Sequence, residues 1–403
     1  MTLDYDVIVE GGGPAGSSAG RFCAQSGLKT LLIEKERLPR YKVCGGCLSV
    51  KASRLLGFDL RPVIENTITG AKITYPPEDM LLLESSEPIG FMVMRDRFDH
   101  LLVEKAMENG TEVLEGEKVV RVRETDSALE VDLGKGQRLR CEYLVGADGS
   151  GSVVSKAFSQ LRLKDNGTGI GLESEVSLHA VTDFPQEDRH IVNLHFGRIP
   201  NGYGWVFPKK EGLSIGIGGI FGSKGKSNPR DHFDAFLKDL NFINGNNMGR
   251  VLGHPLPCFC DEKGKFSSGN VLLVGDAAHL MDPLTGEGIY YAVRSGTLAA
   301  EAIVQSKEKG GEASAPYQDS VRQLLIEDLK WARHLSRIIY GFPALSYRTL
   351  VQHPELGTLC LRVLAGETNY ASFVKKVKER MKGLVKGRFG EKIRNAVSKS
   401  RTA

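Results

Sequence analysis

The sequence predicts an α/β fold with α+β elements, in which a discontinuous doubly wound domain is interrupted by an antiparallel sheet and followed by helices. Three observations predict it. The first fifty residues read as apolar strand, glycine turn, helix and second buried strand. Residues 67–93 and 170–220 hold short alternating segments separated by Gly and Pro, which is typical of an antiparallel sheet. An apolar strand followed by a long helix returns at 271–307, so the first domain resumes there.

The changes of pattern set the predicted domain boundaries. The doubly wound domain comprises 1–66, 95–165 and 265–310, the sheet domain 67–94 and 166–264, and the helical C-terminal region 311–403. In that last region apolar side chains recur at spacings of three and four, and Gly341 and Pro343 end the predicted helix.

The composition excludes several classes of protein. With 403 residues, 41% hydrophobic and 25% charged, the chain is neither disordered nor a small disulfide scaffold. Residues 371–403 hold eleven basic and two acidic side chains, a net charge of +9. The whole chain has a net charge of +4, so the rest of it carries −5. That acidic body argues against nucleic-acid binding. Seven cysteines, an odd number, and the lack of an N-terminal signal-peptide pattern predict reduced thiols in the cytoplasm.

A glycine-rich turn links the first predicted strand to the first predicted helix. The pattern G-x-G-x-x-G is formed by Gly11, Gly13 and Gly16, with Ala15 inside it, and Glu34 ends the next strand. Glycines permit a tight turn and a close approach to a pyrophosphate, the helix N-terminus attracts the anion, and the carboxylate accepts from ribose hydroxyls. In this context the pattern predicts a Rossmann-type dinucleotide site.

Two later motifs indicate which dinucleotide is bound. Asp148 and Asp276 each follow an apolar strand, where a carboxylate can accept from a ribityl hydroxyl. The backbone N–H groups of Gly286, Gly288 and Ile289 open a helix and can face the pyrophosphate or the flavin ring. Helix caps and turns would explain either motif alone, but all three motifs together favour FAD.

The three motifs in this order resemble the FAD-dependent oxidoreductases of the para-hydroxybenzoate hydroxylase fold, which include aromatic monooxygenases, flavin halogenases and geranylgeranyl reductases. The resemblance covers roughly residues 5–310. It implies noncovalent FAD, with further contacts from Lys35, Arg95 and, on the adenine side, Val119. One departure is Glu10, a carboxylate where the family usually has a small or apolar residue.

Two segments select a branch of this superfamily. Residues 39–46 are similar to the P-x-x-x-x-C-G-G segment of geranylgeranyl reductases, and residues 203–218 resemble their Y-x-W-x-F-P…G-x-G motif. The resemblance implies that Cys44, Gly45 and Gly46 lie beside the isoalloxazine. It also implies an apolar prenyl pocket, lined by Tyr203, Trp205, Phe207, Gly216 and Gly218. From the residues alone, three alternating aromatics share one face of a strand, which a packed core would explain as well.

The predicted function is a reductase that saturates C=C bonds of a polyprenyl chain with hydride from reduced FAD. Cys44 is the predicted proton donor or flavin-face residue, since a thiol that stays protonated in an apolar site can donate. The substrate is a prenyl lipid or a prenyl diphosphate, and the electron donor is NAD(P)H or a carrier protein such as reduced ferredoxin. The alternatives are a monooxygenase or halogenase on the same fold, and a prenyl-lipid binding protein that retains flavin.

The other cysteines leave two further readings open. Cys44 and Cys47 form C-x-x-C, as in flavin disulfide reductases, but the second G-x-G-x-x-G of that class is missing. Adding Cys258 and Cys260 gives four thiols with poor spacing for zinc, so no metal is predicted. The remaining three, at 23, 141 and 360, read as buried apolar side chains.

The basic C-terminal tail carries an apolar stripe that includes Phe373 and Val377. A basic amphipathic helix can lie on an anionic membrane surface, which predicts a peripheral position on the inner face of the membrane. The alternative is a helix that packs its stripe on the body of the protein.

Overall fold

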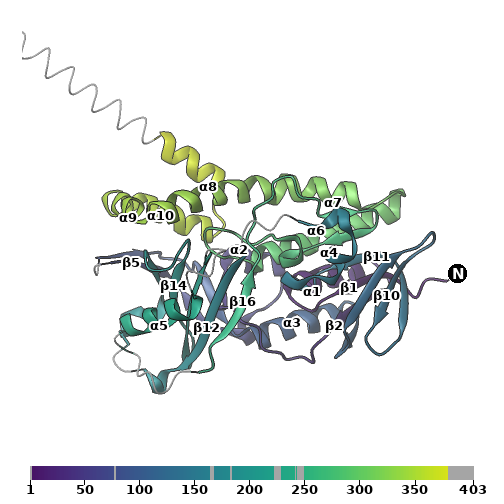
Figure 1. Cartoon of the computed structure of the whole chain (residues 1–403), viewed down its shortest axis with the longest axis horizontal. Coiled ribbons are helices and arrows are strands. Elements are labelled where there is room, and N and C mark those ends of the chain that lie inside the picture. The colour runs from purple at the N-terminus through teal and green to yellow at the C-terminus, as the bar shows by residue number, and fades with distance from the viewer. Residues whose placement is uncertain are drawn as a thin grey trace, which may run out of the picture.

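The computed structural model describes residues 2–76, 79–163, 168–181, 184–221, 228–240, 242 and 249–379. Figure 1 shows two sheet-built parts side by side, with the C-terminal helices laid across them as a common upper layer. One part is built around β1 and α1, and the other around β12 and β14.

The first part contains an eight-stranded sheet with a parallel centre. Strand order is β17-β18-β11-β1-β2-β8, with the β9–β10 hairpin added beside β11. The bounds are β1 Tyr5–Glu10, β2 Thr30–Glu34, β8 Glu112–Glu115, β9 Val119–Glu124, β10 Leu129–Leu133, β11 Arg138–Gly146, β17 Ser267–Ser268 and β18 Val271–Leu273. Because β18 joins strands from the first 150 residues, the doubly wound sheet is discontinuous in sequence, as predicted.

Helices cover this sheet closely because their contact faces carry small side chains. The principal helices are α1 Pro14–Gln25, α3 Arg95–Glu108, α4 Val153–Ala157 and α6 Ile289–Lys309. A Cβ added at Gly296 of α6 would lie 2.2 Å from the carbonyl oxygen of Ala15, so α1 and α6 touch through their backbones. In β1, Val7, Ile8 and Val9 are completely buried, as expected for a core strand that is covered on both faces.

The second part is a seven-stranded sheet in the order β16-β12-β15-β14-β13-β5-β6. The bounds are β5 Gly70–Tyr75, β6 Asp79–Glu84, β12 Gly169–Ser177, β13 Ile191–Phe196, β14 Tyr203–Pro208, β15 Gly212–Gly219 and β16 Leu252–Leu256. All neighbours run antiparallel except β13 and β5, which run parallel from Ile191 opposite Gly70. Helix α5, Pro229–Asp239, packs Phe233 and Phe236 on one face. The other face turns its aromatics towards residues 44–46.

A small third sheet contains β3 Cys47–Ser49, β4 Ile64–Ile68 and β7 Gly90–Val93, and α2, Val50–Leu56, follows β3. Its strands come from both sides of the predicted domain boundaries near 66 and 94, and those boundaries stay a prediction.

The C-terminal region is helical where the structure describes it. Its elements are α7 Ser314–Val321, a π-helical turn Arg322–Ile326, α8 Glu327–Gly341, α9 Pro343–Gln352 and α10 Pro354–Leu364, and residues 370–379 are also helical. The predicted break at Gly341 is present, and Pro343 then begins the next helix at a position where its missing N–H costs nothing. Residues 380–403, which carry most of the predicted basic tail, lie outside the described residues. None of the described helices is long and apolar enough to cross a membrane.

Candidate active site

The glycine turn after β1 combines close packing with an open face. A Cβ at Gly11 would lie 2.3 Å from the carbonyl oxygen of Ala147, and one at Gly16 would lie 1.9 Å from that of Gly11. Gly13 is different, because the nearest side-chain atom, from Arg40, would be 3.9 Å away. The first and third glycines therefore close the turn, and the middle one leaves room for a ligand, as a bound pyrophosphate requires.

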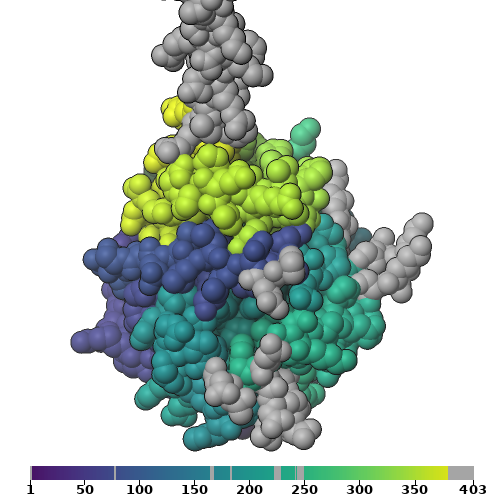
Figure 2. All heavy atoms as spheres, turned by 90° about the vertical axis from the view of Figure 1, so that its left-hand side faces the viewer, coloured from purple at the N-terminus to yellow at the C-terminus, as the bar shows by residue number. Residues whose placement is uncertain are grey.

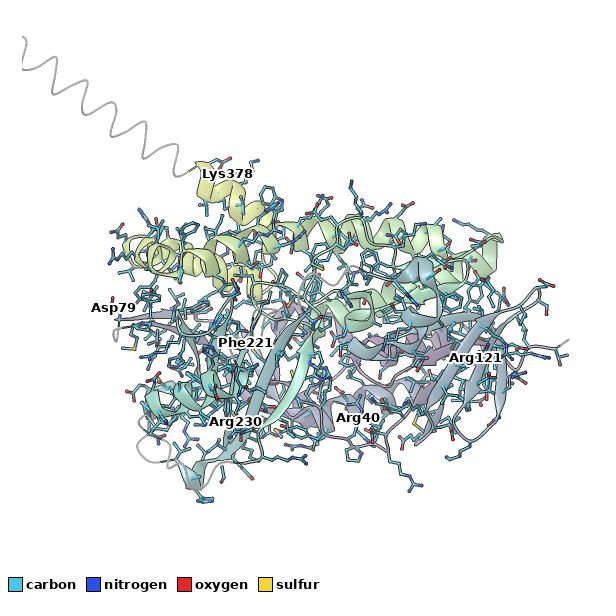
Figure 3. The ribbon with its side chains drawn as sticks, in the orientation of Figure 1. Arg40, Asp79, Arg121, Phe221, Arg230 and Lys378 are labelled. Atoms are coloured by element: carbon cyan, nitrogen blue, oxygen red, sulfur yellow. The ribbon has the colours of Figure 1, made fainter. Side chains whose placement is uncertain are left out.

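Glu34, buried at the end of β2, is fixed against this turn. It accepts from the N–H of Gly12 at 2.9 Å and from the Arg40 guanidinium at 3.3 Å. Arg40, which lies beside α3 (Figure 3), also donates to Asp99 at 2.9 Å, and Arg95 donates to the same carboxylate at 2.8 Å. This chain of charges joins the predicted ribose contact to the predicted flavin contact. Lys35 follows Glu34 and is exposed.

Two carboxyls meet where β1 and β11 end. One oxygen of Asp148 accepts from the N–H of Val154 at 3.4 Å and also from that of Val153, so it caps α4. Its other oxygen is buried and finds no donor among the described residues, and one oxygen of Glu10 is in the same state. Asp148 is thus both a cap and an acceptor left for a hydroxyl group. Burial, and then the charge of Asp148, raise the pKa of Glu10 to about 9, so Glu10 is neutral at pH 7.

The third predicted motif lies where β18 ends and α6 begins. Asp276 is in the 3-10 turn Gly275–Ala278, and a Cβ at Gly288 would lie 3.8 Å from its carboxylate. Gly286 has a φ of +71°, which favours glycine, and Ile289 is the buried first residue of α6. The motif thus forms one surface with the helix N-terminus.

Three tyrosines and one aspartate hold residues 282–288 in place, and sequence reasoning missed this role for all four. Asp282, fully buried, accepts from the hydroxyl of Tyr370 at 2.6 Å. Tyr203 and Tyr340 donate to the backbone carbonyls at 285 and 284. The predicted flavin loop is therefore clamped by the sheet and by the C-terminal helices. The contacts link residues far apart in sequence, so no local motif indicates them.

Residues 44–46 lie on the aromatic face of β14. A Cβ at Gly45 would lie 2.9 Å from the Phe207 ring and 3.1 Å from the Trp205 indole nitrogen. Gly46 has a φ of +76°, and its N–H donates to the Cys44 sulfur at 3.4 Å. Gly45 therefore packs against the two rings, and half-buried Cys44 is the residue that precedes it in the chain.

The Cys44 sulfur also contacts the Arg95 guanidinium. Burial alone would lower the pKa of Arg95, but Asp99 and Cys44 raise it above its usual value, so the cation persists. None of the seven cysteines forms a disulfide bond. Within the described ranges, no three His, Cys, Asp or Glu side chains gather as metal ligands. Cys23 and Cys141 are fully buried, whereas Cys360 is half-buried and only partly fits its prediction.

The three aromatics of β14 do share one face. Ring centroids are 6.2 Å apart for Tyr203 and Trp205 and 6.0 Å for Trp205 and Phe207. Across the sheet, a Cβ at Gly216 would lie 2.1 Å from the Trp205 ring, and one at Gly218 would lie 3.5 Å from it. Gly216 therefore makes room for the tryptophan, whereas Gly218 meets the ring at an ordinary contact distance.

A buried glutamate beneath Cys44 was also missed. Glu173 of β12 accepts from the Cys44 N–H at 3.3 Å, from the Tyr41 hydroxyl at 3.1 Å and from Ser214 at 3.1 Å. Burial, and then Glu175, raise its pKa to about 7. The sequence signal that could have indicated this site is the pair Glu173 and Glu175, which are charged residues in a strand otherwise made of apolar and small residues.

Val119 is not brought to these groups by its side chain, which is buried in the core at the start of β9. Its predicted contact with the adenine side of the cofactor stays a prediction.

An open glycine turn, a ribose-side carboxylate, an unsatisfied carboxylate oxygen and a helix N-terminus together fit a flavin dinucleotide on a doubly wound fold. They define an FAD-binding oxidoreductase. The family model of the FAD binding domain matches residues 4–212 and 263–317, and the geranylgeranyl reductase catalytic domain matches residues 174–252.

The chain belongs to the geranylgeranyl reductase family. It is 32% identical to the digeranylgeranylglycerophospholipid reductase of Picrophilus torridus, over 75% of this chain and 78% of the relative. It is 30% identical to the chloroplastic geranylgeranyl diphosphate reductase of Nicotiana tabacum, over 75% and 67%.

Solved structures agree with this fold. A geranylgeranyl bacteriochlorophyll reductase-like protein from Thermoplasma acidophilum superposes with a TM-score of 0.72 at 26% identity, covering 84% of this chain and 87% of the other. A flavin-dependent brominase gives the same TM-score at 22% identity, covering 94% and 99%, and that likeness shows the fold alone.

Proposed function

We propose that this enzyme saturates C=C bonds of a polyprenyl chain carried by a lipid or a diphosphate. The observation that carries the proposal is the packing of Gly45, the residue after Cys44, on the Trp205 and Phe207 rings. Cys44 thus adjoins an apolar aromatic wall along the chain, and that wall is the surface that a prenyl chain would contact. The similar proteins from Picrophilus and Nicotiana are named for digeranylgeranylglycerophospholipid and geranylgeranyl diphosphate.

The residues that would hold FAD line one continuous edge. The turn at Gly13, the carboxylates of Glu34 and Asp148, and the start of α6 at Gly288 supply the contacts that a dinucleotide needs. When bound in reduced form, FAD supplies hydride for one carbon of the double bond. We propose NAD(P)H or a reduced carrier such as ferredoxin as the source of electrons.

Residues of the chain hold and deliver the proton that must reach the other carbon of the double bond. Cys44 is the proposed donor, and Gly46 and Arg95 hold its sulfur in place. Glu173, with a pKa of about 7, fixes the backbone of Cys44 and can hold a proton behind it.

The test is Cys44→Ser in the FAD-loaded enzyme, incubated anaerobically with a panel of prenyl lipids and diphosphates and read by mass. We expect the flavin absorbance to persist and prenyl reduction to fall by about 10²-fold or more, the usual contribution of a general acid. Cys47→Ser is the matched control and should stay active. Unchanged turnover in Cys44→Ser would remove Cys44 from the mechanism.

The same assay separates the alternatives. A monooxygenase or halogenase would consume oxygen in step with substrate, whereas a reductase adds one dihydrogen per saturated bond without oxygen. A prenyl-lipid binding protein would leave reduced flavin unoxidised with every prenyl compound.

We also propose that the basic tail contacts the inner face of the membrane. Its residues 380–403 lie outside the described part of the chain.

A further inference from the structure

The junction of α8 and α9 exposes large apolar side chains at one corner of the molecule. We define the α8–α9 corner as Ile338, Phe342, Leu345 and Val351. Phe342 and Leu345 are 64% and 65% exposed, and Ile338 is 57% exposed. Single exposed apolar residues are ordinary, but a group within fourteen residues around one helix junction is a contact surface. Figure 2 shows the C-terminal helices forming the top of the face to which this corner belongs.

The charge around the corner selects the chemistry of its partner. No Asp or Glu occurs between residues 329 and 354, and Arg337 and Arg348 are exposed among the apolar side chains. Lys375, Lys376 and Lys378 are exposed as well, and Lys378 (Figure 3) lies over the Trp331 ring, near the other end of α8. Two acidic side chains lie near α9: Asp79 at the start of β6, below it in the same view, and Glu355, which is 3.6 Å from His353 at the end of α9. The corner is therefore apolar and cationic.

This charge argues against the two other occupants of such a surface. A second copy using the same patch would bring the arginines of one copy, Arg337 and Arg348, against those of the other. Residues 380–403 hold eight basic side chains and one acidic one, so covering the corner with the tail would also join like charges. An anionic lipid surface offers the opposite charge and an apolar interior.

A row of aromatic rings runs from the corner to the proposed active site. Tyr340, two residues before Phe342, stacks with Phe196 at 6.2 Å between ring centroids. Phe196 lies 5.6 Å from Tyr203, and Tyr203 continues through Trp205 to Phe207, beneath the Cys44 segment. Stacking of Tyr347 on Tyr75, at 5.4 Å, anchors α9 to the sheet. The row therefore connects α8, next to the corner, with the aromatic face of β14.

We propose that the α8–α9 corner docks on an anionic bilayer and that the prenyl chain of a membrane lipid enters along this aromatic row. The docking stands on the corner alone, whereas the entry route rests on the proposed function.

The test uses the full-length, FAD-loaded protein and sedimentation with vesicles of phosphatidylcholine and phosphatidylglycerol at 3:1. We expect the double variant Phe342→Glu, Leu345→Glu to bind at least ten-fold more weakly than the wild type. The matched control is Met107→Glu, Val120→Glu, which changes two apolar residues that are 53% and 52% exposed on α3 and β9. It should bind as the wild type does. Thermal unfolding of both variants checks that each is folded.

Several results would overturn the docking proposal. They are equal binding by the two double variants, equal binding of the wild type to pure phosphatidylcholine, and loss of binding only when residues 380–403 are deleted. A wild-type dimer, seen by light scattering, that the corner substitutions dissociate would also overturn it.

Activity measurements separate failure of the docking proposal from failure of the proposed function. The corner variant should keep turnover of a dispersed prenyl diphosphate while losing reduction of a vesicle-embedded prenyl lipid, and a wild type that reduces neither would reject the function instead.

Discussion

Glu10 shows how one side chain can be tolerated where its charge would be unfavourable. It lies at the end of β1, buried beside Asp148, where a pyrophosphate would approach the glycine turn. A carboxylate there would repel the anion, but its raised pKa keeps it protonated at neutral pH. The unusual residue is therefore compatible with the dinucleotide site.

Glu10→Gln should change stability in a pH-dependent way. The native state holds the Glu10 proton up to about pH 9, whereas the ordinary value is 4.5. Between those values the native state binds the extra proton, so its stability falls as pH rises, by up to about 1.4 kcal/mol per pH unit. Glutamine removes this loss. We expect its unfolding temperature to exceed the wild type's at pH 8 and to approach it near pH 4.

Thermal unfolding across that pH range measures the effect, at about 2–4 °C per kcal/mol. Glu36→Gln, at an exposed position two residues after Glu34, is the matched control and should give a flat difference. A flat difference for Glu10→Gln as well would mean that Glu10 is already ionised in the native protein.

The places of residues within short motifs could be predicted from the sequence. The places of residues whose contacts join distant parts of the chain could not. Gly13, Glu34 and Cys44 stand in recognisable patterns. The structure places Gly13 and Glu34 at the turn after β1, and Cys44 next to Gly45 at the aromatic face of β14. Their cofactor and substrate contacts stay predictions. The bonds that Glu173, Asp282 and Tyr370 make at the site could not be predicted from a short pattern, because they join residues between 41 and 132 positions apart in sequence.

At the scale of elements, the pairing of β14 with β15 depends on two glycines that differ in what surrounds them. Gly216→Ala forces a Cβ into the Trp205 ring, which is also held through its indole N–H to Ser214 at 3.2 Å. We expect a loss of about 1–3 kcal/mol in urea unfolding, the usual cost of overpacking, and an altered tryptophan emission. Gly218→Ala meets only ordinary contacts and should be neutral or slightly stabilising. Equal stability of the two variants would contradict this packing.

Element types followed from the sequence more readily than strand directions did. Continuous apolar runs, the glycine turn and the break at Gly341 predicted strands and helices that the structure contains. Alternation alone gives no direction, so the parallel pairing of β13 with β5 inside an otherwise antiparallel sheet was not predicted.

At the scale of the whole molecule, the C-terminal helices are tied to the predicted flavin loop, residues 282–288, because the Tyr370 hydroxyl donates to Asp282. Tyr370→Phe leaves a buried carboxylate with one donor fewer, which should cost about 1.5–3 kcal/mol of stability and weaken FAD binding. Urea unfolding and flavin titration measure the two effects. Tyr5→Phe removes an exposed hydroxyl bond to Glu112 at 2.8 Å and should change neither. Matching effects in the two variants would show that the clamp at Asp282 adds nothing.

The discontinuous sheet also has a consequence for synthesis on the ribosome. Val7 pairs with Tyr143, and α1 packs on α6, which begins at Ile289. At about 5–20 residues per second, the apolar first strand waits roughly 7–27 s for one neighbour and longer for its helical cover. The β1 edge that pairs with β11 and the α1 face that packs on α6 therefore stay exposed in nascent chains until those segments emerge. Lower growth temperatures or added chaperones should raise the yield of folded enzyme.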